Sequence, residues 1–243
     1  MGRTAGCPPA VTRPAFAAEA ETCVRQLLAY GPAELGQMLH VGGSVTADAA
    51  LRFRRFFAPE TQEVPAILAY TGIVFRYLDP TSFSEADFAY AQRHLFITSF
   101  LYGLLRPLDG IRPYRLEGDV RLPDPDGPTR FDYWKPRLTD RLIEAVRGDD
   151  GVLVNLASAE MKRLFDWRRV CAAVRVVTPE FRVADGDRLR SVVVYTKMCR
   201  GAMTRFILRN RLSAPSDLSR FEPSPDNAVG QLPVVVSGIP DAG

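Results

Sequence analysis

The sequence has few of the residues that build metal and redox centres. It contains four cysteines, with no Cys-X-X-Cys pair, and two histidines: Cys7, Cys23, Cys171, Cys199, His40 and His94. Zinc sites and redox dithiols are built from closely spaced cysteine and histidine side chains, so this spacing predicts neither kind of site. A haem ligand has nothing in its favour either. We therefore expect no metal site and no cofactor.

Long hydrophobic runs are also missing. No stretch approaches the roughly 18 apolar residues needed to cross a bilayer. The first residues, MGRTAGCPPAVTRP, lack the apolar region of a secretory signal. The sequence therefore predicts a cytoplasmic location without membrane contact, and it leaves the oligomeric state open.

Familiar enzyme motifs and lysines are scarce as well. The chain has no glycine-rich phosphate loop, no His-Glu-X-X-His pair and no Gly-X-Ser-X-Gly elbow, so whether it is an enzyme stays open.

Of the 31 basic residues only Lys135, Lys162 and Lys197 are lysines. A lysine kept among so many arginines suggests a need for a compact ammonium, or for an amine that can lose its proton.

What is present is the composition of an ordinary globular protein, 47% hydrophobic and 24% charged. Helical spacing dominates the first half and short apolar runs the second, with no repeat and no long linker. We expect one compact domain over residues 1–243, of the α+β or mixed α/β class. Residues 1–15 form an irregular segment, and residues 213–243 form a proline-rich segment with a last strand at Val234–Val236.

Local signals predict several helices in the first half. Gly31-Pro32 breaks a first helix, and a short second helix follows at Ala33–Leu39. Thr46 is a candidate N-cap for a helix over Ala47–Phe57. Ser84 and Asp87 form a capping-box-like start for another helix.

The central segment Leu101–Gly118, LYGLLRPLDGIRPYRLEG, predicts a helix-hairpin-helix turn. Gly103 lies between apolar residues, with helical patterns on either side. In such a turn unpaired backbone N–H groups and helix N-termini can face a DNA phosphate. Arg106 and Arg115 follow this glycine as candidate phosphate ligands. Alternatively, Gly103 merely permits a tight turn and the arginines pair with neighbouring carboxylates.

The run Gly151–Leu156 predicts a buried strand that ends in polar residues. Asn155 lies at its carboxyl end and Ser158 follows shortly after. Ligand contacts in α/β folds are commonly placed beyond the carboxyl ends of strands, which makes both residues binding candidates. The alternative is that they cap the next helix.

A basic segment runs from Arg188 to Arg211 without a single acidic residue. A local field of one sign attracts phosphates, carboxylates or nucleic acid, although these charges could also be a solvated helix face. The pattern predicts a strand at Ser191–Tyr195, a loop, and a helix over Gly201–Leu212.

Six residues around this loop carry the candidate chemistry: Tyr195, Lys197, Cys199, Arg200, Gly201 and Arg205. Gly201 would allow a ligand to approach the backbone closely. Positive neighbours would lower the pKa of the Cys199 thiol and favour its reactive thiolate form. The alternative for Cys199 is a small apolar residue in a packed turn.

Four blocks in order resemble the YaaA family, the bacterial peroxide stress proteins. They are YTGIVFRYLDPTSFSEADFAYAQRHL, LYGLLRPLDGIRPYRLEG, NLASAE and YTKMCRGAMTRFILRNRL, within Pro59 to Leu212. Family members open with a β-strand and a segment of the Ser-Pro-Ala-Lys type, where this chain has MGRTAGCPPAVTRP. It is therefore similar to a divergent member that lacks the usual N-terminal motif.

The resemblance implies a compact mixed α/β domain of the family's own type, with a helix-hairpin-helix element and a basic cleft. It implies binding of duplex or branched DNA, and a role in limiting oxidative DNA damage and free iron; it attaches no enzymatic reaction. The family's pattern falls on Tyr70, Thr71, Gly72, Gly103, Arg106, Pro107, Tyr114, Arg115, Trp134, Asn155, Ser158, Lys197, Arg200, Gly201 and Arg205.

Three functions remain open at this point. The first is a nucleic-acid-binding stress protein that contacts DNA phosphates. The second is an enzyme acting on a small anionic or heteroaromatic substrate, with Lys197, Tyr195 and Cys199 as catalytic candidates and Arg200 and Arg205 holding an anion. The third is a partner-binding protein without a ligand of its own.

Overall fold

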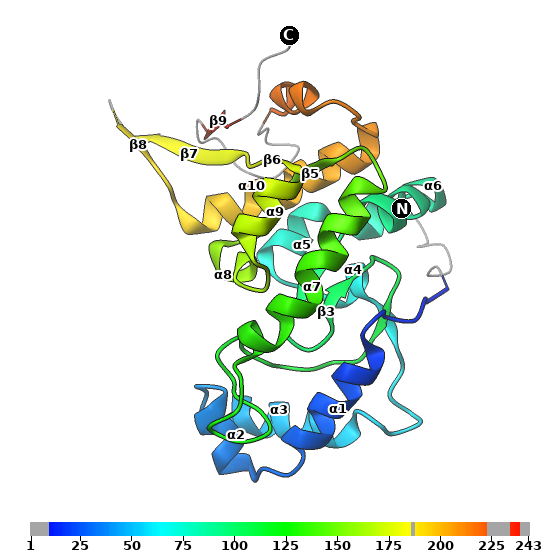
Figure 1. Cartoon of the computed structure of the whole chain (residues 1–243), viewed down its shortest axis with the longest axis vertical. Coiled ribbons are helices and arrows are strands. Elements are labelled where there is room, and N and C mark those ends of the chain that lie inside the picture. Colours follow the sequence, from blue (N-terminus) through cyan, green and yellow to red (C-terminus); the bar gives the residue numbers. More distant parts are fainter. Residues whose placement is uncertain (1–9, 186–187, 223–233, 239–243) are drawn as a thin grey trace, which may run out of the picture.

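Helices make up most of the regular structure (Figure 1). The computed structural model describes residues 10–185, 188–222 and 234–238. The helical segments are α1 (Ala17–Leu27), α2 (Pro32–Met38), α3 (Gly43–Arg55), α4 (Ala66–Ala69), α5 (Ile73–Leu78), η1 (Pro80–Ser82), α6 (Glu85–His94), α7 (Arg130–Arg147), α8 (Ala159–Lys162), α9 (Trp167–Ala173), α10 (Val193–Asn210) and η2 (Pro215–Arg220). The strands are β1 (Val64–Pro65), β2 (Ile97–Ser99), β3 (Gly103–Leu105), β4 (Gly110–Ile111), β5 (Val152–Val154), β6 (Arg175–Val177), β7 (Glu180–Asp185), β8 (Arg188–Arg190) and β9 (Val234–Ser237). This is a single domain of mixed α+β structure, as predicted.

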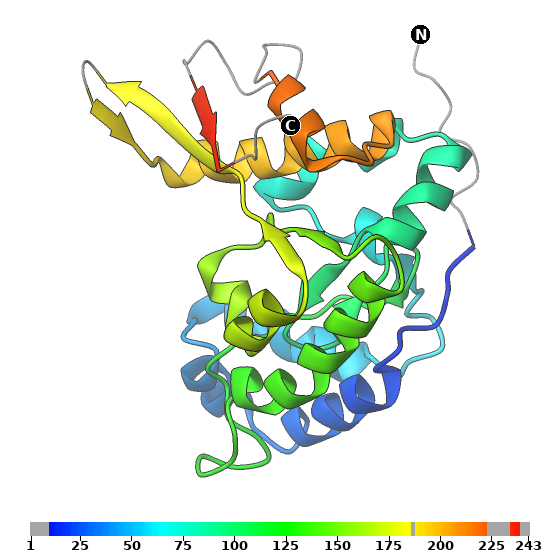
Figure 2. The same ribbon diagram turned by 45° about the horizontal axis from the view of Figure 1, so that its top comes forward.

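The strands of the described residues form small, separate sheets. Antiparallel pairs join β1 to β4 and β2 to β3, and β5 pairs with β6 in parallel. β7 lies between β8 and β9, antiparallel to both. The β7–β8 ribbon projects from the body of the molecule in both views (Figures 1 and 2). Because each sheet is small, packed helices rather than a large sheet hold the fold together.

The main core surrounds α7. Trp134 is fully buried there, its indole N–H donates to the carbonyl oxygen of Phe100 at 2.8 Å, and Phe16 of the N-terminal region meets its ring edge-on at 5.3 Å. Burying one such aromatic side chain stabilises the fold by roughly 2–3 kcal/mol. The apolar face of α7 thus joins the N-terminal segments to the centre of the chain.

A second apolar cluster gathers under α10, which lies along α5 at the top of the molecule (Figure 1). The helices meet at Gly201, where a Cβ atom would lie 2.1 Å from the carbonyl oxygen of Val74. Farther along, the Arg205 guanidinium lies 3.4 Å from the Asp79 carboxylate. The two helices therefore run in parallel, with the start of α10 toward the start of α5.

The prediction of a helix-hairpin-helix turn over Leu101–Gly118 was wrong. The segment contains strands β3 and β4, and Gly103 is the first residue of β3. Gly103 has φ +71°, and a Cβ there would lie 2.8 Å from the Trp134 ring. The glycine is needed because the hairpin backbone lies directly on that indole, in a conformation that other residues adopt only at a cost.

The predicted strand over Ser191–Tyr195 was also wrong, because α10 already begins at Val193. The β-branched run favours a strand locally. However, the Thr196 N–H donates to the Val192 carbonyl oxygen at 2.9 Å, which extends the helix backwards from the part that packs on α5. Val193 and Val194 stay 68% and 50% exposed, so no strand partner covers them.

Several other predictions are confirmed. The Ser84 Oγ accepts from the Asp87 N–H and starts α6, and β9 includes Val234–Val236. β5 lies within the predicted Gly151–Leu156 run, but its residues are half-buried rather than buried. Residues 1–9 of the predicted irregular segment lie outside the described residues. Among the residues that the structure describes, no helix is long and apolar enough to cross a membrane.

Candidate nucleic-acid interface

The connection between α2 and α3 is a tight turn at the opposite end of the molecule from α10 (Figure 1). α2 ends in a Schellman motif. The His40 N–H donates to the Gln37 carbonyl oxygen at 3.2 Å, and the Val41 N–H donates to that of Gly36 at 2.9 Å. His40 takes the left-handed conformation of this motif, with φ +53°. These bonds fix the direction in which the chain leaves α2.

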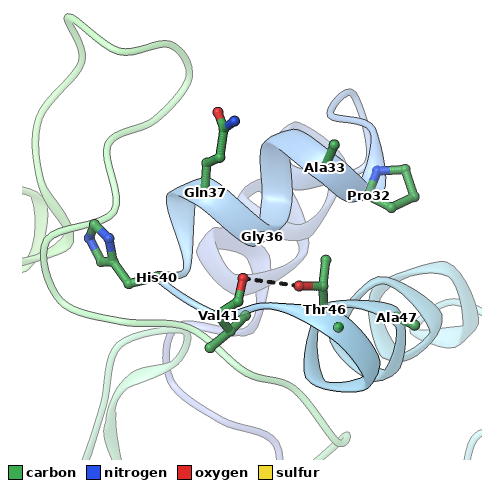
Figure 3. Close-up of a pocket in the computed structure, with 9 residues that line it drawn as sticks. Pro32, Ala33, Gly36, Gln37, His40, Val41, Thr46 and Ala47 are labelled. Atoms are coloured by element: carbon green, nitrogen blue, oxygen red, sulfur yellow. Dashed lines mark hydrogen bonds between the residues drawn. The ribbon is translucent and has the colours of Figure 1, made fainter.

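The two helices touch where Gly36 faces Thr46 (Figure 3). A Cβ at Gly36 would lie 2.8 Å from the Thr46 Oγ1, so only glycine allows this approach. The Thr46 hydroxyl donates to the Val41 carbonyl oxygen at 3.1 Å across the turn. Thr46 therefore lies inside α3 as a contact residue, and the prediction that it caps the helix was wrong.

The start of α3 is open to solvent. Gly42 is the extended N-cap residue, Gly43 has φ +57°, and no side chain accepts a hydrogen bond from the first turn. Gly42, Gly43 and Ser44 are all exposed. The first N–H groups of a helix have no partner within it and carry partial positive charge, so this turn presents free donors.

An open cavity of about 660 Å³ lies on this surface. Its lining comes from both helices and the turn, namely Pro32, Ala33, Gly36, Gln37, His40, Val41, Gly43, Thr46 and Ala47 (Figure 3). The acids nearby are engaged: Glu34 accepts from the Gly31 N–H, Asp48 pairs with Arg52, and Asp119 pairs with His40. Arg52 therefore partly offsets the charge of Asp48, whereas Glu34 and Asp119 are held by single hydrogen bonds.

This turn was not among the predicted site residues, although both of its helices were predicted. The available signal was Gly42-Gly43 between two short helical patterns. That pattern resembles the one that drew attention to Gly103, but here the glycines lie between helices.

Helix α10 carries several predicted ligand residues near the α5–α10 seam, which is defined by the contacts of Gly201 with Val74 and of Arg205 with Asp79. Lys197 is exposed and forms no hydrogen bond or ion pair with another described residue. Arg200 is half-buried, and burial lowers the pKa of its guanidinium without a carboxylate partner among the described residues. Arg205, by contrast, faces Asp79. Two cations of the basic segment therefore remain available to an anion.

Not every predicted residue of α10 suits the role that was assigned to it. Gly201 faces α5, so its missing side chain serves helix packing. Cys199 is fully buried, and burial raises the pKa of its thiol to about 11. The thiol is therefore protonated at neutral pH and lacks the exposed thiolate that a nucleophile needs. Tyr195 is partly buried one turn before Cys199.

Tyr70 and Tyr114 are brought together with a residue that the sequence analysis did not single out, Ser99. The Ser99 Oγ accepts from the N–H groups of Leu101 and Tyr102, which occupies both of its lone pairs. Its proton therefore goes to the Tyr114 hydroxyl at 2.8 Å, and the Tyr114 proton goes to the Tyr70 hydroxyl at 2.7 Å. Burial raises the pKa of both tyrosines, so both stay protonated.

Thr71 and Gly72, the predicted site residues that follow Tyr70, are exposed just before α5. Nothing lies within 4 Å of a Cβ built on Gly72. The chain therefore has open space beside Gly72, directly before α5.

The other predicted binding residues are engaged within the fold. The Arg106 guanidinium stacks on Phe96 at 3.6 Å and donates to the Arg93 carbonyl oxygen. Arg115 pairs with Glu117 at 3.0 Å. Arg106 is therefore held within the fold, whereas Arg115 stays exposed on the surface beside one carboxylate.

Asn155 and Ser158 are engaged as well. Asn155 donates to the Thr178 hydroxyl and accepts from the Ala157 N–H, and Ser158 accepts from the Met161 N–H as the N-cap of α8. Capping and turn contacts therefore account for these side chains. No group of three or more His, Cys, Asp or Glu side chains within the described ranges could hold a metal ion.

Comparison with known proteins places these features in a family. A family model described as "Peroxide stress protein YaaA" matches residues 3–225. A UPF0246 protein of Bacteroides fragilis is 54% identical over 213 residues, which cover 88% of this chain and 83% of the relative. A UPF0246 protein of Porphyromonas gingivalis is 49% identical over 191 residues, covering 78% and 75%. One of Aromatoleum aromaticum is 40% identical over 220 residues, covering 88% and 84%.

Proposed function

Because the chain belongs to the peroxide stress protein YaaA family, we propose that it serves the oxidative stress response by binding DNA through phosphate contacts. The α2–α3 turn is the helix-hairpin-helix element of this proposal, in place of the Leu101–Gly118 segment. The observation that carries it is the exposed, uncapped start of α3, held in position by the Schellman turn and by the Gly36–Thr46 contact.

The physical basis is the match between this turn and a phosphate group. Backbone N–H groups at a helix N-terminus are unpaired donors at the positive end of a dipole, which is where anions bind. Contacts of this kind go to the DNA backbone and carry no base information, so binding without sequence preference is expected. The cavity is open to solvent and suits a duplex backbone laid across the turn.

The test replaces Ser44, which is exposed in the first turn of α3. Ser44→Glu adds a negative charge at the helix N-terminus, which should stabilise the fold by about 0.3–1 kcal/mol. The same charge repels a phosphate, so we expect duplex DNA affinity to fall at least about fivefold, equivalent to about 1 kcal/mol. Fluorescence anisotropy at low salt measures the affinity, and thermal unfolding measures the stability.

Ser44→Gln is the matched control, because it has a similar size without the charge and should bind DNA like the parent. Parent binding should also weaken steeply as salt rises, because phosphate contacts release counterions. No binding of the parent to duplex or junction DNA at low salt refutes the proposed function. Equal affinity for the parent and Ser44→Glu refutes only the role of the α2–α3 turn.

A second candidate is an enzyme on a small anionic or heteroaromatic substrate at the α5–α10 seam. Lys197 and Arg200 favour it because neither has a carboxylate partner among the described residues. Lys197 would carry the proton or the amine, with Tyr195 nearby, and Arg200 would hold the anion, since Arg205 is directed to Asp79.

Inorganic phosphate is the probe for this second candidate. In isothermal titration calorimetry Arg200→Gln should weaken phosphate binding about tenfold, whereas Arg54→Gln, an exposed arginine of α3, should leave it unchanged. Equal weakening in both variants would show only a loss of net charge and would exclude an anion site at the seam.

A further inference from the structure

A smaller cavity lies near the N-terminal end of the described chain, away from the α2–α3 turn. Its volume is about 380 Å³, within the range of small-molecule sites. The segment 11–14 forms one wall. This wall is fixed, because the Thr12 N–H donates to the Leu108 carbonyl oxygen and the Gly110 N–H donates to that of Thr12, both at 2.8 Å. The cavity therefore has a defined shape without a ligand.

One hydrogen-bond donor on the inner wall of this cavity has no acceptor, and a second unpaired donor is buried behind the wall. The Tyr102 hydroxyl accepts from the Arg112 N–H at 3.1 Å, and its own proton has no acceptor among the described residues. Burial raises the pKa of Tyr102, so the proton stays in place. The Arg112 Nη1 donates to the Phe56 carbonyl oxygen at 2.7 Å, while its Nε is buried without an acceptor. These donors suit an anionic oxygen.

Two carboxylates lie at the rim of the cavity, each beside an arginine that partly offsets its charge. The Glu21 and Glu63 carboxylates line it, with side chains that are 41% and 43% exposed. Glu21 pairs with Arg25 at 3.1 Å, and Glu63 is only 3.5 Å from the Arg112 Nη2. Arg13 is also exposed at this rim. Carboxylates at the mouth repel a DNA phosphate and attract an ammonium group.

We propose that this cavity binds a small zwitterion, namely an amino acid with an aromatic side chain. Its carboxylate accepts from the Tyr102 hydroxyl beside the Arg112 charge, its ammonium lies between Glu21 and Glu63, and its ring packs against the apolar lining residues Val11, Pro14 and Ala17. Donors inside and acceptors at the rim match the two charges of an amino acid, which a simple anion or a simple amine would match only in part.

Three probes of the same shape test the charge pattern: L-phenylalanine, 3-phenylpropionate without the ammonium, and phenethylamine without the carboxylate. Isothermal titration calorimetry on the full chain should give binding of L-phenylalanine, with each single-charge analogue at least about tenfold weaker. No binding of L-phenylalanine at millimolar concentration, or equal binding of an analogue, would overturn the proposal.

Two variants locate the site. Glu21→Gln, at the rim, should weaken L-phenylalanine binding about fivefold without changing affinity for 3-phenylpropionate, which has no ammonium. Glu85→Gln, exposed on α6, is the matched control and should change neither. An equal loss for both ligands in Glu21→Gln would place the binding elsewhere. DNA affinity should be unaffected by L-phenylalanine, so this proposal and the DNA-binding proposal can fail independently.

Discussion

Single glycines decide contacts that no side chain would permit. Gly201 lets α10 rest on the backbone of α5, and Gly103 lets a hairpin lie on the Trp134 ring. Gly36 does the same for α2 and α3 at Thr46. In each place a second segment of the chain occupies the space of the missing Cβ, so these glycines hold elements together at a distance set by backbone contact.

Gly201→Ala tests this at the residue scale. The added Cβ would lie 2.1 Å from the Val74 carbonyl oxygen, so α10 must move away from α5. Alanine gains about 1 kcal/mol in helix propensity, but overpacking against backbone costs more. We expect a net loss of about 2 kcal/mol in the free energy of unfolding, measured by urea denaturation.

Gly148→Ala is the control for this prediction. Gly148 ends α7 in a right-handed conformation with φ −75°, which alanine adopts readily, so stability should change by less than about 0.5 kcal/mol. A stabilised Gly201→Ala variant would mean that α10 and α5 are not in the contact described here.

The buried cysteines also illustrate the residue scale. Burial raises the pKa of Cys23 and of Cys199 to about 11, and for Cys23 the nearby Arg130 charge opposes that rise only in part. A nearby positive charge is therefore insufficient to make a thiolate when water is excluded. Both residues act as small apolar side chains in their clusters.

At the scale of elements, similar local patterns lead to different structures. Gly103 and the Gly42-Gly43 pair each follow a predicted helix and lie beside apolar residues. Gly103 joins β3, because β2 supplies a ladder and Trp134 supplies a surface. Gly42-Gly43 remain exposed and start α3. The neighbours in space, rather than the glycines themselves, determine which turn forms.

At the scale of the whole molecule, long-range ion pairs tie α10 to the rest of the chain. Arg205 meets Asp79, and Arg211 just after the helix meets Asp87 of α6 at 2.9 Å. Each pair joins residues more than a hundred positions apart.

α10 and the α2–α3 turn lie at opposite ends of the molecule (Figures 1 and 2), so one small ligand cannot contact both.

Asp87→Asn tests the tie between α6 and the end of α10. Burial alone would raise the pKa of the Asp87 carboxyl, but hydrogen bonds from Ser84 and the Arg211 charge outweigh it and lower that pKa below its usual value. A carboxyl with a lowered folded-state pKa stabilises the fold above its unfolded pKa, near 4, and this stability is lost as pH falls through the folded pKa. The variant should lose about 1–2 kcal/mol at pH 7.

The pH dependence separates charge from packing in this test. As pH falls through the lowered folded-state pKa of Asp87, the parent carboxyl also becomes protonated, so the difference between parent and Asp87→Asn in urea unfolding should shrink. Glu85→Gln on the same helix should show little difference at any pH. A loss that stays equally large from pH 7 down to the lowest pH at which the parent is folded would contradict the role of the charge.

Local chemistry in the sequence determined the elements whose signals lie within a few residues. The Ser84–Asp87 box starts α6, the amphipathic pattern gives α7, and the apolar run at Val152 gives β5, because capping and periodicity depend on near neighbours. The four ordered blocks were sufficient to identify the family. The change from helical spacing to short apolar runs was sufficient to predict a mixed α+β domain.

Only the tertiary structure decided which candidate residues remain available to a ligand. Arg106, Asn155 and Ser158 make hydrogen bonds inside the fold and Arg115 forms a surface ion pair, whereas Lys197 and Arg200 have no carboxylate partner among the described residues. The physical reason is that hydrogen bonds, ion pairs and close backbone contacts depend on segments that are distant in sequence. Local propensity contributes at most about 1 kcal/mol per residue, and packing against those segments overrides it.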